Sequence, residues 1–93
     1  MNMDKLKSIV AKVNNHDAVL TDIELSNGIL FQFANSEVTA YMGCAVLKAW
    51  CSSPTLKLEK DVWGHDYLSI GYDCLTIKPS EIETIDIDES TTN

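Results

Sequence analysis

The side chains that could perform covalent chemistry in this chain are few and widely spaced. His65, Asp66 and Cys74 are the residue types needed for a cysteine nucleophile, its base and an orienting acid. Cys74 also opens a predicted strand, where a cysteine packs as a small hydrophobic side chain. The sequence has no Gly-x-Ser-x-Gly motif, phosphate-binding loop or dinucleotide fingerprint. We therefore expect no enzymatic activity; a small enzyme that uses Cys74 and His65 is the alternative.

Metal ligands are equally sparse. The two histidines, His16 and His65, and the three cysteines, Cys44, Cys51 and Cys74, form none of the close pairs typical of zinc sites. We expect no metal and no cofactor. The odd number of cysteines indicates reduced thiols, and the chain shows neither a signal-peptide pattern nor an apolar run near the ~20 residues of a membrane span. These features predict a cytoplasmic protein with no membrane partner.

The charge balance is strongly acidic. The chain has fourteen acidic residues, seven lysines and no arginine, which gives a net charge of −7. Because arginine is the preferred side chain for phosphate and guanine recognition, direct binding to nucleic acid is disfavoured. The same field attracts basic surfaces, so we expect the partner to be another protein with a basic surface. The alternative is that the acids only keep a small domain soluble.

Two acidic segments are candidate partner-binding surfaces. The first combines aromatic and acidic side chains of the kind that anchor interfaces: Asp61, Trp63, His65, Asp66, Tyr67, Tyr72 and Asp73. The second is the carboxyl-terminal acid series: Glu81, Glu83, Asp86 and Asp88. Alternate carboxylates on a strand lie about 6.6 Å apart, whereas duplex DNA carries a charge every ~1.7 Å, so the series fits only a local phosphate decoy. Aromatic residues that cover the core and a solvated strand face are the simpler alternatives.

Alternating and helical patterns place most secondary-structure elements. Residues 3–13 have the spacing of an amphipathic helix. Six segments alternate as strands do: residues 18–25, 29–34, 56–59, 67–70, 74–78 and 85–88. Ser26-Asn27-Gly28 predicts a hairpin turn between the first two strands, and a helical turn at Ser80 precedes the last strand.

The stretch from residue 36 to residue 52 is predicted to be a helix that Asn35 or Ser36 caps and a proline ends. Apolar side chains recur at helical spacing on two of its faces, although Gly43 lowers the helix propensity by about 1 kcal/mol relative to alanine. The competing interpretation is a strand over residues 38–42 before a shorter helix.

A helix with two apolar faces needs more cover than a single sheet provides. We therefore expect a homodimer through the second face, whose members are Ala40, Cys44, Leu47 and Cys51. In this interpretation Leu47→Asp separates the dimer. The strand edge near residues 56–60 is the alternative interface.

Together these elements predict an α+β fold, with a mainly antiparallel sheet of four to six strands and an amino-terminal helix and one longer central helix packed on one face. Residues 1–89 form a single domain, and residues 90–93 form a frayed polar tail. The predicted core draws on all of these elements: Leu6, Ile9, Val10, Ile23, Leu25, Phe31, Phe33, Met42, Ala45, Trp50, Leu75, Ile77 and Ile85.

Three parts of the chain follow one another in a recognisable order. They are the short amino-terminal helix, the hairpin IELSNGILFQ at residues 23–32, and the terminal LTIKPSEIETI at residues 75–85. This layout resembles that of Sm-like or SH3-like small barrels, in which the last strand follows one short helical turn. The resemblance covers about half of the chain and no functional motif. Residues 36–66 depart from it, and the basic RNA-binding residues of Sm-like proteins are absent.

These observations favour a non-enzymatic, small acidic protein-binding module. By analogy with phage- or plasmid-encoded anti-defence proteins, it acts as an inhibitor or decoy that blocks a basic, nucleic-acid-binding surface of its partner. The alternatives are a small-ligand-binding domain with an aromatic pocket under Trp50 or Trp63, and a small structural domain of SH3-like or Sm-like layout.

Overall fold

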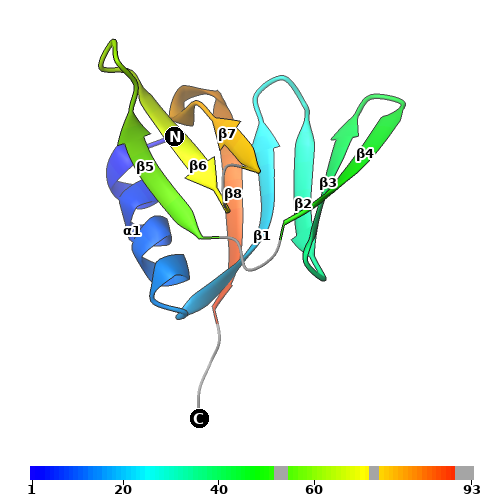
Figure 1. Cartoon of the computed structure of the whole chain (residues 1–93), viewed down its shortest axis with the longest axis horizontal. Helices are drawn as coiled ribbons and strands as arrows, with labels where there is room; N and C mark the ends of the chain where they lie inside the picture. Colours follow the sequence, from blue (N-terminus) through cyan, green and yellow to red (C-terminus); the bar gives the residue numbers. More distant parts are fainter. Residues whose placement is uncertain (52–54, 72–73, 90–93) are drawn as a thin grey trace.

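The computed structural model describes residues 1–51, 55–71 and 74–89. In this part of the chain, eight strands form two antiparallel sheets, accompanied by one amino-terminal helix and one short 3-10 turn (Figure 1). In chain order the elements are α1 (Met3–Asn14), β1 (Ala18–Leu25), β2 (Leu30–Ala34), β3 (Glu37–Met42), β4 (Ala45–Trp50), β5 (Leu56–Lys60), β6 (Asp66–Ile70), β7 (Leu75–Ile77), η1 (Pro79–Glu81) and β8 (Ile82–Glu89). The structure is therefore mostly β.

The larger sheet has the strand order β4-β3-β2-β1-β8, so the last strand of the chain pairs with the first. Strands β1 to β4 form an antiparallel meander, and β8 returns to the free side of β1 after η1. Because side chains alternate along each strand, the sheet has an inner and an outer face. One row of the inner face crosses all five strands: Ile85, Ile23, Phe31, Ala40 and Leu47.

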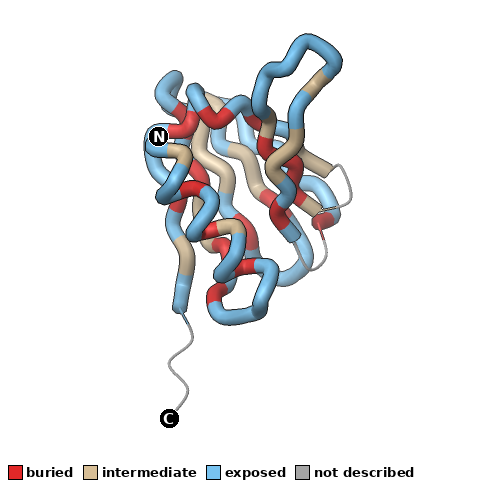
Figure 2. Tube along the Cα trace, turned by 90° about the vertical axis from the view of Figure 1, so that its left-hand side faces the viewer, coloured by how far each residue is buried: buried red, intermediate tan, exposed pale blue. Residues whose placement is uncertain are grey.

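The smaller sheet, in the order β5-β6-β7, shares one core with α1 and the larger sheet. Leu6 of α1, Ile23 of β1 and Leu68 of β6 are completely buried in this core. Figure 2 shows buried stretches along α1 and the strands, with exposed loop tips. In Figure 1 the β3–β4 hairpin stands at the right, away from α1 and the smaller sheet. On the inner face of that hairpin Val38 of β3 is buried, whereas Leu47 of β4 exposes 58% of its surface.

The sequence of α1 accounts for its boundaries and its orientation. The Asn2 side chain accepts the Asp4 N–H at 2.8 Å and caps the helix. Leu6, Ile9 and Val13 follow at helical spacing and form the buried stripe.

A side-chain clamp joins the end of α1 to the start of β5. The Asn14 Nδ2 donates to the Leu56 carbonyl oxygen at 2.7 Å, and the Asn14 Oδ1 accepts the Leu56 N–H at 2.9 Å. Asn14 thus takes the place of a neighbouring strand at the first residue of β5.

The predicted fold class is wrong in its central element. Instead of a helix over residues 36–52, the chain forms β3 and β4, which are joined by a turn at Gly43 and Cys44. Gly43 has a φ of 61°, a left-handed conformation that suits a turn and is foreign to a helix interior. The apolar residues that suggested two helix faces are distributed over both faces of a hairpin. The competing strand over residues 38–42 is confirmed, and the shorter helix after it is wrong.

The predicted single sheet of four to six strands is also wrong, since the described residues form eight strands in two sheets. The amino-terminal helix, the hairpin around Ser26-Asn27-Gly28 and the helical turn before the last strand are confirmed. Seven predicted core residues are buried: Leu6, Ile9, Ile23, Leu25, Phe33, Ile77 and Ile85. Ala45 and Trp50, which only the helix placed in the core, are exposed. Four others are half-buried: Val10, Phe31, Met42 and Leu75.

Across the described residues, no helix is both long and apolar enough to cross a bilayer, and α1 has 12 residues.

Candidate functional site

The outer face is the side of the larger sheet that points away from the core. The ladder places two rows of outward side chains across all five strands. The first row is polar: Asp86, Asp22, Gln32, Thr39 and Lys48. The second row runs from polar to apolar: Thr84, Glu24, Leu30, Tyr41 and Val46. The outer face is therefore acidic over β1 and β8 and mixed over β3 and β4, where polar and apolar side chains alternate along the strands.

Four carboxylates form an acidic patch on the β1–β8 half of this face: Asp22, Glu24, Asp86 and Asp88. Asp22 and Asp86 lie directly opposite each other in the ladder, where Cα atoms are about 4.5–5.5 Å apart. Like charges in this position destabilise a sheet. Among the described residues, no ion pair neutralises any member of the patch. The fold thus maintains an unfavourable concentration of negative charge at the surface.

The cation in the first row is too distant to offset this charge. Lys48 lies three strands away from Asp22, which is about 14 Å at ~4.8 Å per strand. This distance exceeds the Debye length of about 8 Å at physiological ionic strength. The field of the acidic patch is therefore directed outward to solvent or to a partner.

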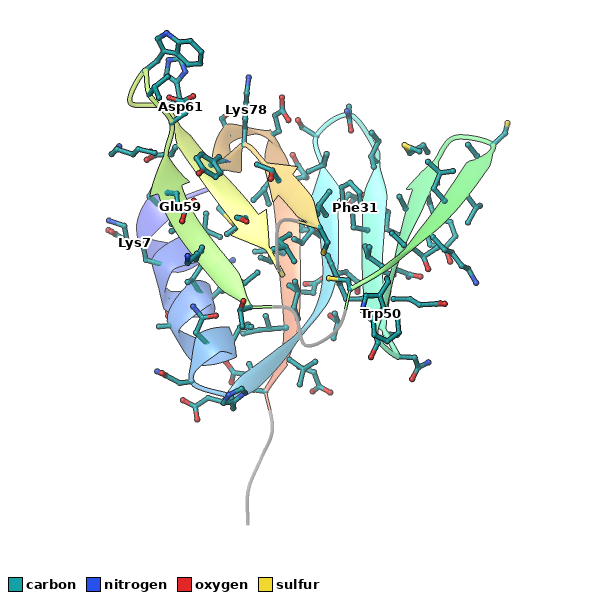
Figure 3. All side chains as sticks on the ribbon, viewed as in Figure 1. Lys7, Phe31, Trp50, Glu59, Asp61 and Lys78 are labelled. Atoms are coloured by element: carbon teal, nitrogen blue, oxygen red, sulfur yellow. The ribbon has the colours of Figure 1, made fainter. Side chains whose placement is uncertain are left out.

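The β3–β4 half of the outer face exposes large apolar side chains. Tyr41 and Val46 are direct ladder partners, and Trp50 stands opposite Glu37. Val46 exposes 53% of its surface and Trp50 exposes 72%. Figure 3 shows Trp50 at the end of β4. Exposed aromatic residues beside a charged surface are common anchors of protein interfaces.

The carboxyl-terminal acid series predicted from the sequence is divided by the structure. Asp86 and Asp88 belong to the acidic patch. Glu81 lies in η1, and Glu83 lies where the register between β1 and β8 is irregular, so neither is part of the two rows. The predicted decoy surface keeps half of its expected members.

Sequence reasoning missed two members of the acidic patch, Asp22 and Glu24 of β1. Their alternation with apolar residues marked them as the polar side of a strand, as it did for Asp86 and Asp88. Only the pairing of β8 with β1 brings the two polar sides together. A search for acidic alternation in two strands that share a sheet would have identified them.

The predicted aromatic-acidic surface begins in the β5–β6 loop, which Asp61 organises from within. The Asp61 Oδ1 accepts the backbone N–H groups of Trp63 and His65, both at 2.9 Å. These hydrogen bonds, that of His65 first, hold the pKa of the Asp61 carboxyl below its ordinary value. Gly64 allows the turn with a φ of 82°. Asp61 is a structural residue of this loop, whereas Val62 and Trp63 are exposed at its tip.

The other members of that surface are engaged along β6. The Lys60 Nζ pairs with Asp66 at 2.8 Å. The Tyr67 hydroxyl donates to the Glu59 Oε2 at 2.5 Å, and this bond lowers the pKa of Glu59. Two predicted members lie outside the described residues: Tyr72 and Asp73. The structure therefore groups Asp61, Trp63 and His65 in one loop and gives the strand residues structural partners.

Cys74 and His65 do not form the catalytic pair considered from the sequence. They lie at opposite ends of β6, whose five residues span about 17 Å. The Cys74 Sγ instead donates to the Sγ of the buried Cys51 at 2.7 Å. Burial raises the pKa of the Cys51 thiol to about 12, with a further contribution from Cys74. The reactive thiolate of Cys51 is therefore scarce at neutral pH.

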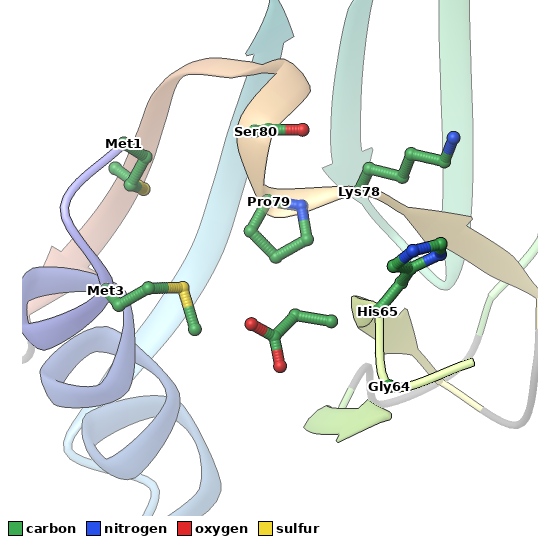
Figure 4. A pocket seen from close by; sticks show the side chains of 8 residues that line it. Met1, Met3, Gly64, His65, Lys78, Pro79 and Ser80 are labelled. Atoms are coloured by element: carbon green, nitrogen blue, oxygen red, sulfur yellow. The ribbon is translucent and has the colours of Figure 1, made fainter. Parts of the chain in front are cut away.

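A pocket of about 550 Å³ lies between the start of α1, the β5–β6 loop and η1 (Figure 4). Its lining mixes sulfur, charged and polar groups: Met1, Met3, Gly64, His65, Asp66, Lys78, Pro79 and Ser80. Neither tryptophan lines this pocket, and both Trp50 and Trp63 are largely exposed. In the described part of the chain, no group of three or more His, Cys, Asp or Glu side chains is arranged to hold a metal ion.

The residues predicted for self-association do not form one surface. Ala40 and Leu47 are ladder partners on the inner face of the hairpin, Cys44 lies in its turn, and Cys51 is buried beyond β4. A groove of about 350 Å³ opens on this face between the hairpin and β7. Its lining is mainly apolar: Phe31, Val38, Ala40, Leu47, Lys48, Ala49, Cys74 and Leu75.

Comparison with known proteins assigns no family to the chain: no protein-family model, no curated protein and no solved structure matches it. A proposal about function must therefore be argued from the structure itself, and the outer face and the β3–β4 hairpin are its most unusual surfaces.

Proposed function

We propose that the chain is a non-enzymatic, cytoplasmic protein-binding module whose acidic patch docks on a basic surface of a partner protein. The observation that supports this proposal is the direct opposition of Asp22 and Asp86, which no ion pair neutralises within the described residues. Two facing carboxylates cost the isolated sheet stability, and a lysine or arginine placed between them reverses the sign of the interaction.

The proposed consequence of docking is inhibition. A surface rich in lysine and arginine is one that binds phosphates, and the patch competes for it as a local decoy. Tyr41, Val46 and Trp50, on the same outer face, extend the contact with apolar area. Small acidic antagonists encoded by phages or plasmids act in this way, which is an analogy of size and charge.

The test removes charge from the patch without removing volume. Asp22→Asn combined with Asp86→Asn should weaken partner binding at least about tenfold, because two charge-assisted contacts are lost. The same change should leave the fold intact or stabilise it by about 0.2–1 kcal/mol, because the repulsion between strands disappears. Partner capture from the source cells, followed by affinity and thermal unfolding measurements on the purified pair, checks both expectations.

The matched control is Asp4→Asn combined with Glu81→Gln, which changes the net charge equally at exposed sites away from the acidic patch. This variant should bind as the unmodified protein does, and duplex DNA should compete for the partner. Equal weakening by both variants would assign the effect to net charge alone. A captured partner without a basic surface would refute the proposal.

A further inference from the structure

Strand β4 is the least protected sheet edge among the described residues. It is the terminal strand of the larger sheet, all six of its residues are exposed, and Lys48 is its single charged residue. Natural sheets protect their edges with charges, irregular register, short length or a cover. The other edges in the described residues have such protection: β8 carries acids and an irregular register, Asn14 clamps β5, and β7 has three residues.

The backbone groups that β4 leaves free belong to alternate residues. Beyond the end of the strand, Cys51 donates its N–H to the Ser36 carbonyl oxygen at 2.8 Å. Because facing residues in an antiparallel ladder alternate between bonded and non-bonded pairs, the odd-numbered residues of β4 bond to β3. The N–H and C=O groups of Val46, Lys48 and Trp50 therefore point away from the sheet.

We propose that β4 pairs antiparallel with β4 of a second copy of the chain, about a two-fold axis at Leu47. In this register Leu47 faces Leu47 of the second copy, and Lys48 faces Val46. Since Val46 and Lys48 both have free backbone groups, each such pair exchanges hydrogen bonds in both directions. The larger sheet then continues through both copies.

Charge selects this register among the symmetric ones. Moving the axis to Lys48 places the two Lys48 side chains directly opposite each other, which is destabilising. Moving it to Val46 pairs Lys48 with the turn residue Cys44 and shortens the ladder. The hairpin itself carries no net charge, because Glu37 and Lys48 are the charged residues between positions 37 and 50. A second copy is therefore an acceptable neighbour at this edge despite the net charge of −7.

The inner face of the hairpin supports the same arrangement. A two-fold axis perpendicular to the sheet keeps the inner faces of both copies on one side, so the two Leu47 side chains touch beside the two apolar grooves. Ala49 and Ala45 face each other across the axis and allow close approach. Pairing of one edge strand is a small interface, so we expect a dissociation constant in the micromolar range.

Sedimentation equilibrium from tens to hundreds of micromolar, in reducing buffer, tests the dimer. The unmodified chain should be a dimer and Leu47→Asp a monomer, because the variant places two carboxylates at the axis. Val46→Pro should also give a monomer, since it removes an outward N–H and leaves the bonds to β3 intact. Val62→Asp, which adds the same charge at an exposed residue of the β5–β6 loop, should remain a dimer. Far-UV circular dichroism identifies any variant that does not fold. If one of the two disrupting variants, Leu47→Asp or Val46→Pro, fails to fold, the oligomeric state of the other tests the dimer.

Cross-linking tests the register. In a Cys44→Ser background, Leu47→Cys should form a covalent dimer under mild oxidation, because a non-bonded antiparallel pair has the Cα separation of a disulfide. Lys48→Cys in the same background should form at least tenfold less covalent dimer. A monomer at every concentration, a dimer that survives both disrupting variants, a larger oligomer, or preferential cross-linking at position 48 would each overturn the proposal. The Asp22→Asn, Asp86→Asn variant should still dimerise, so this result is separate from partner binding.

Discussion

The aspartates of this chain differ in the groups that surround their carboxylates. Asp61 accepts the N–H groups of Trp63 and His65, so its charge is used inside the β5–β6 loop. Asp22 and Asp86 face each other, so each charge is opposed by its neighbour. A carboxylate that local donors satisfy stabilises a turn, and one that faces another carboxylate gains stability only from outside the molecule.

The Asp61 loop should respond to acid with a definite sign. The folded pKa of Asp61 is lowered, so the contribution of its carboxylate is complete above the ordinary value of 3.8 and is lost as the pH falls through the folded value. Asp61→Ala should remove this contribution at every pH and accelerate amide hydrogen exchange at Trp63 and His65. Exchange measured by NMR across this pH range checks the expectation.

Asp61→Asn is the matched control for this prediction, because it retains an acceptor oxygen without the charge. It should keep the protection of the Trp63 and His65 amides, relative to the exchange of an unfolded chain at the same pH, and this protection should no longer depend on pH. Amides in β2, which is remote from the loop in sequence, should be unchanged in both variants. Unchanged loop exchange in Asp61→Ala would show that the turn forms without its carboxylate.

The sequence located the loop residues but not their role. The grouping of Asp61, Trp63 and His65 is local, so the order of residues along the chain is enough to show it. The use of Asp61 as the acceptor inside that turn requires coordinates. The acidic patch was harder to predict, because Asp22 and Asp86 are brought together by a long-range strand pairing.

At the scale of elements, charged residues decided which segments could be predicted. In β1, Asp22 and Glu24 alternate with buried residues, so the pattern fits only the period of 2 that is typical of a strand. In β3 and β4 nearly every residue is apolar, and periods of 2 and 3.6 fit equally well. The left-handed φ of Gly43 resolves the ambiguity in favour of a hairpin.

The clamp between α1 and β5 gives the stability prediction at this scale. Asn14→Ala removes both hydrogen bonds to Leu56 and leaves its partly buried backbone groups without these partners. We expect a loss of about 1–2 kcal/mol in the free energy of unfolding, which lowers the Tm by roughly 4–8 °C per kcal/mol in a chain of this size. Thermal unfolding followed by circular dichroism measures it.

The neighbouring Asn15→Ala is the control for this substitution. Asn15 is exposed at the end of α1, where its backbone N–H bonds to the Ala11 carbonyl oxygen, so the change should be nearly neutral. A similar loss in both variants would indicate a general effect on the helix end. A neutral Asn14→Ala would show that packing alone holds α1 on β5.

Across the whole molecule, the two proposed surfaces lie at opposite ends of the larger sheet. The acidic patch occupies β1 and β8. Self-pairing uses the backbone edge of β4 and leaves the outward side chains of Tyr41, Val46 and Trp50 on the open outer face, so the two kinds of binding can occur together. The expectation of a basic partner rests on net charge, which follows from composition alone. The location of each surface depended on strand order, which the sequence did not reveal once residues 36–52 were interpreted as a helix.

The charge of the whole chain predicts how salt acts on the proposed dimer. Two copies with a net charge of −7 each repel, and salt shortens the Debye length from about 10 Å at 0.1 M to about 3 Å at 1 M. Because the paired hairpins carry no net charge, screening removes repulsion without weakening an interfacial ion pair. The dissociation constant should therefore fall as sodium chloride rises from low to molar concentration, as measured by sedimentation equilibrium. Asp22→Asn with Asp86→Asn removes two charges from −7, leaving −5, and should flatten this dependence. A dimer that salt weakens would require an ion pair at its interface, which pairing about Leu47 does not contain.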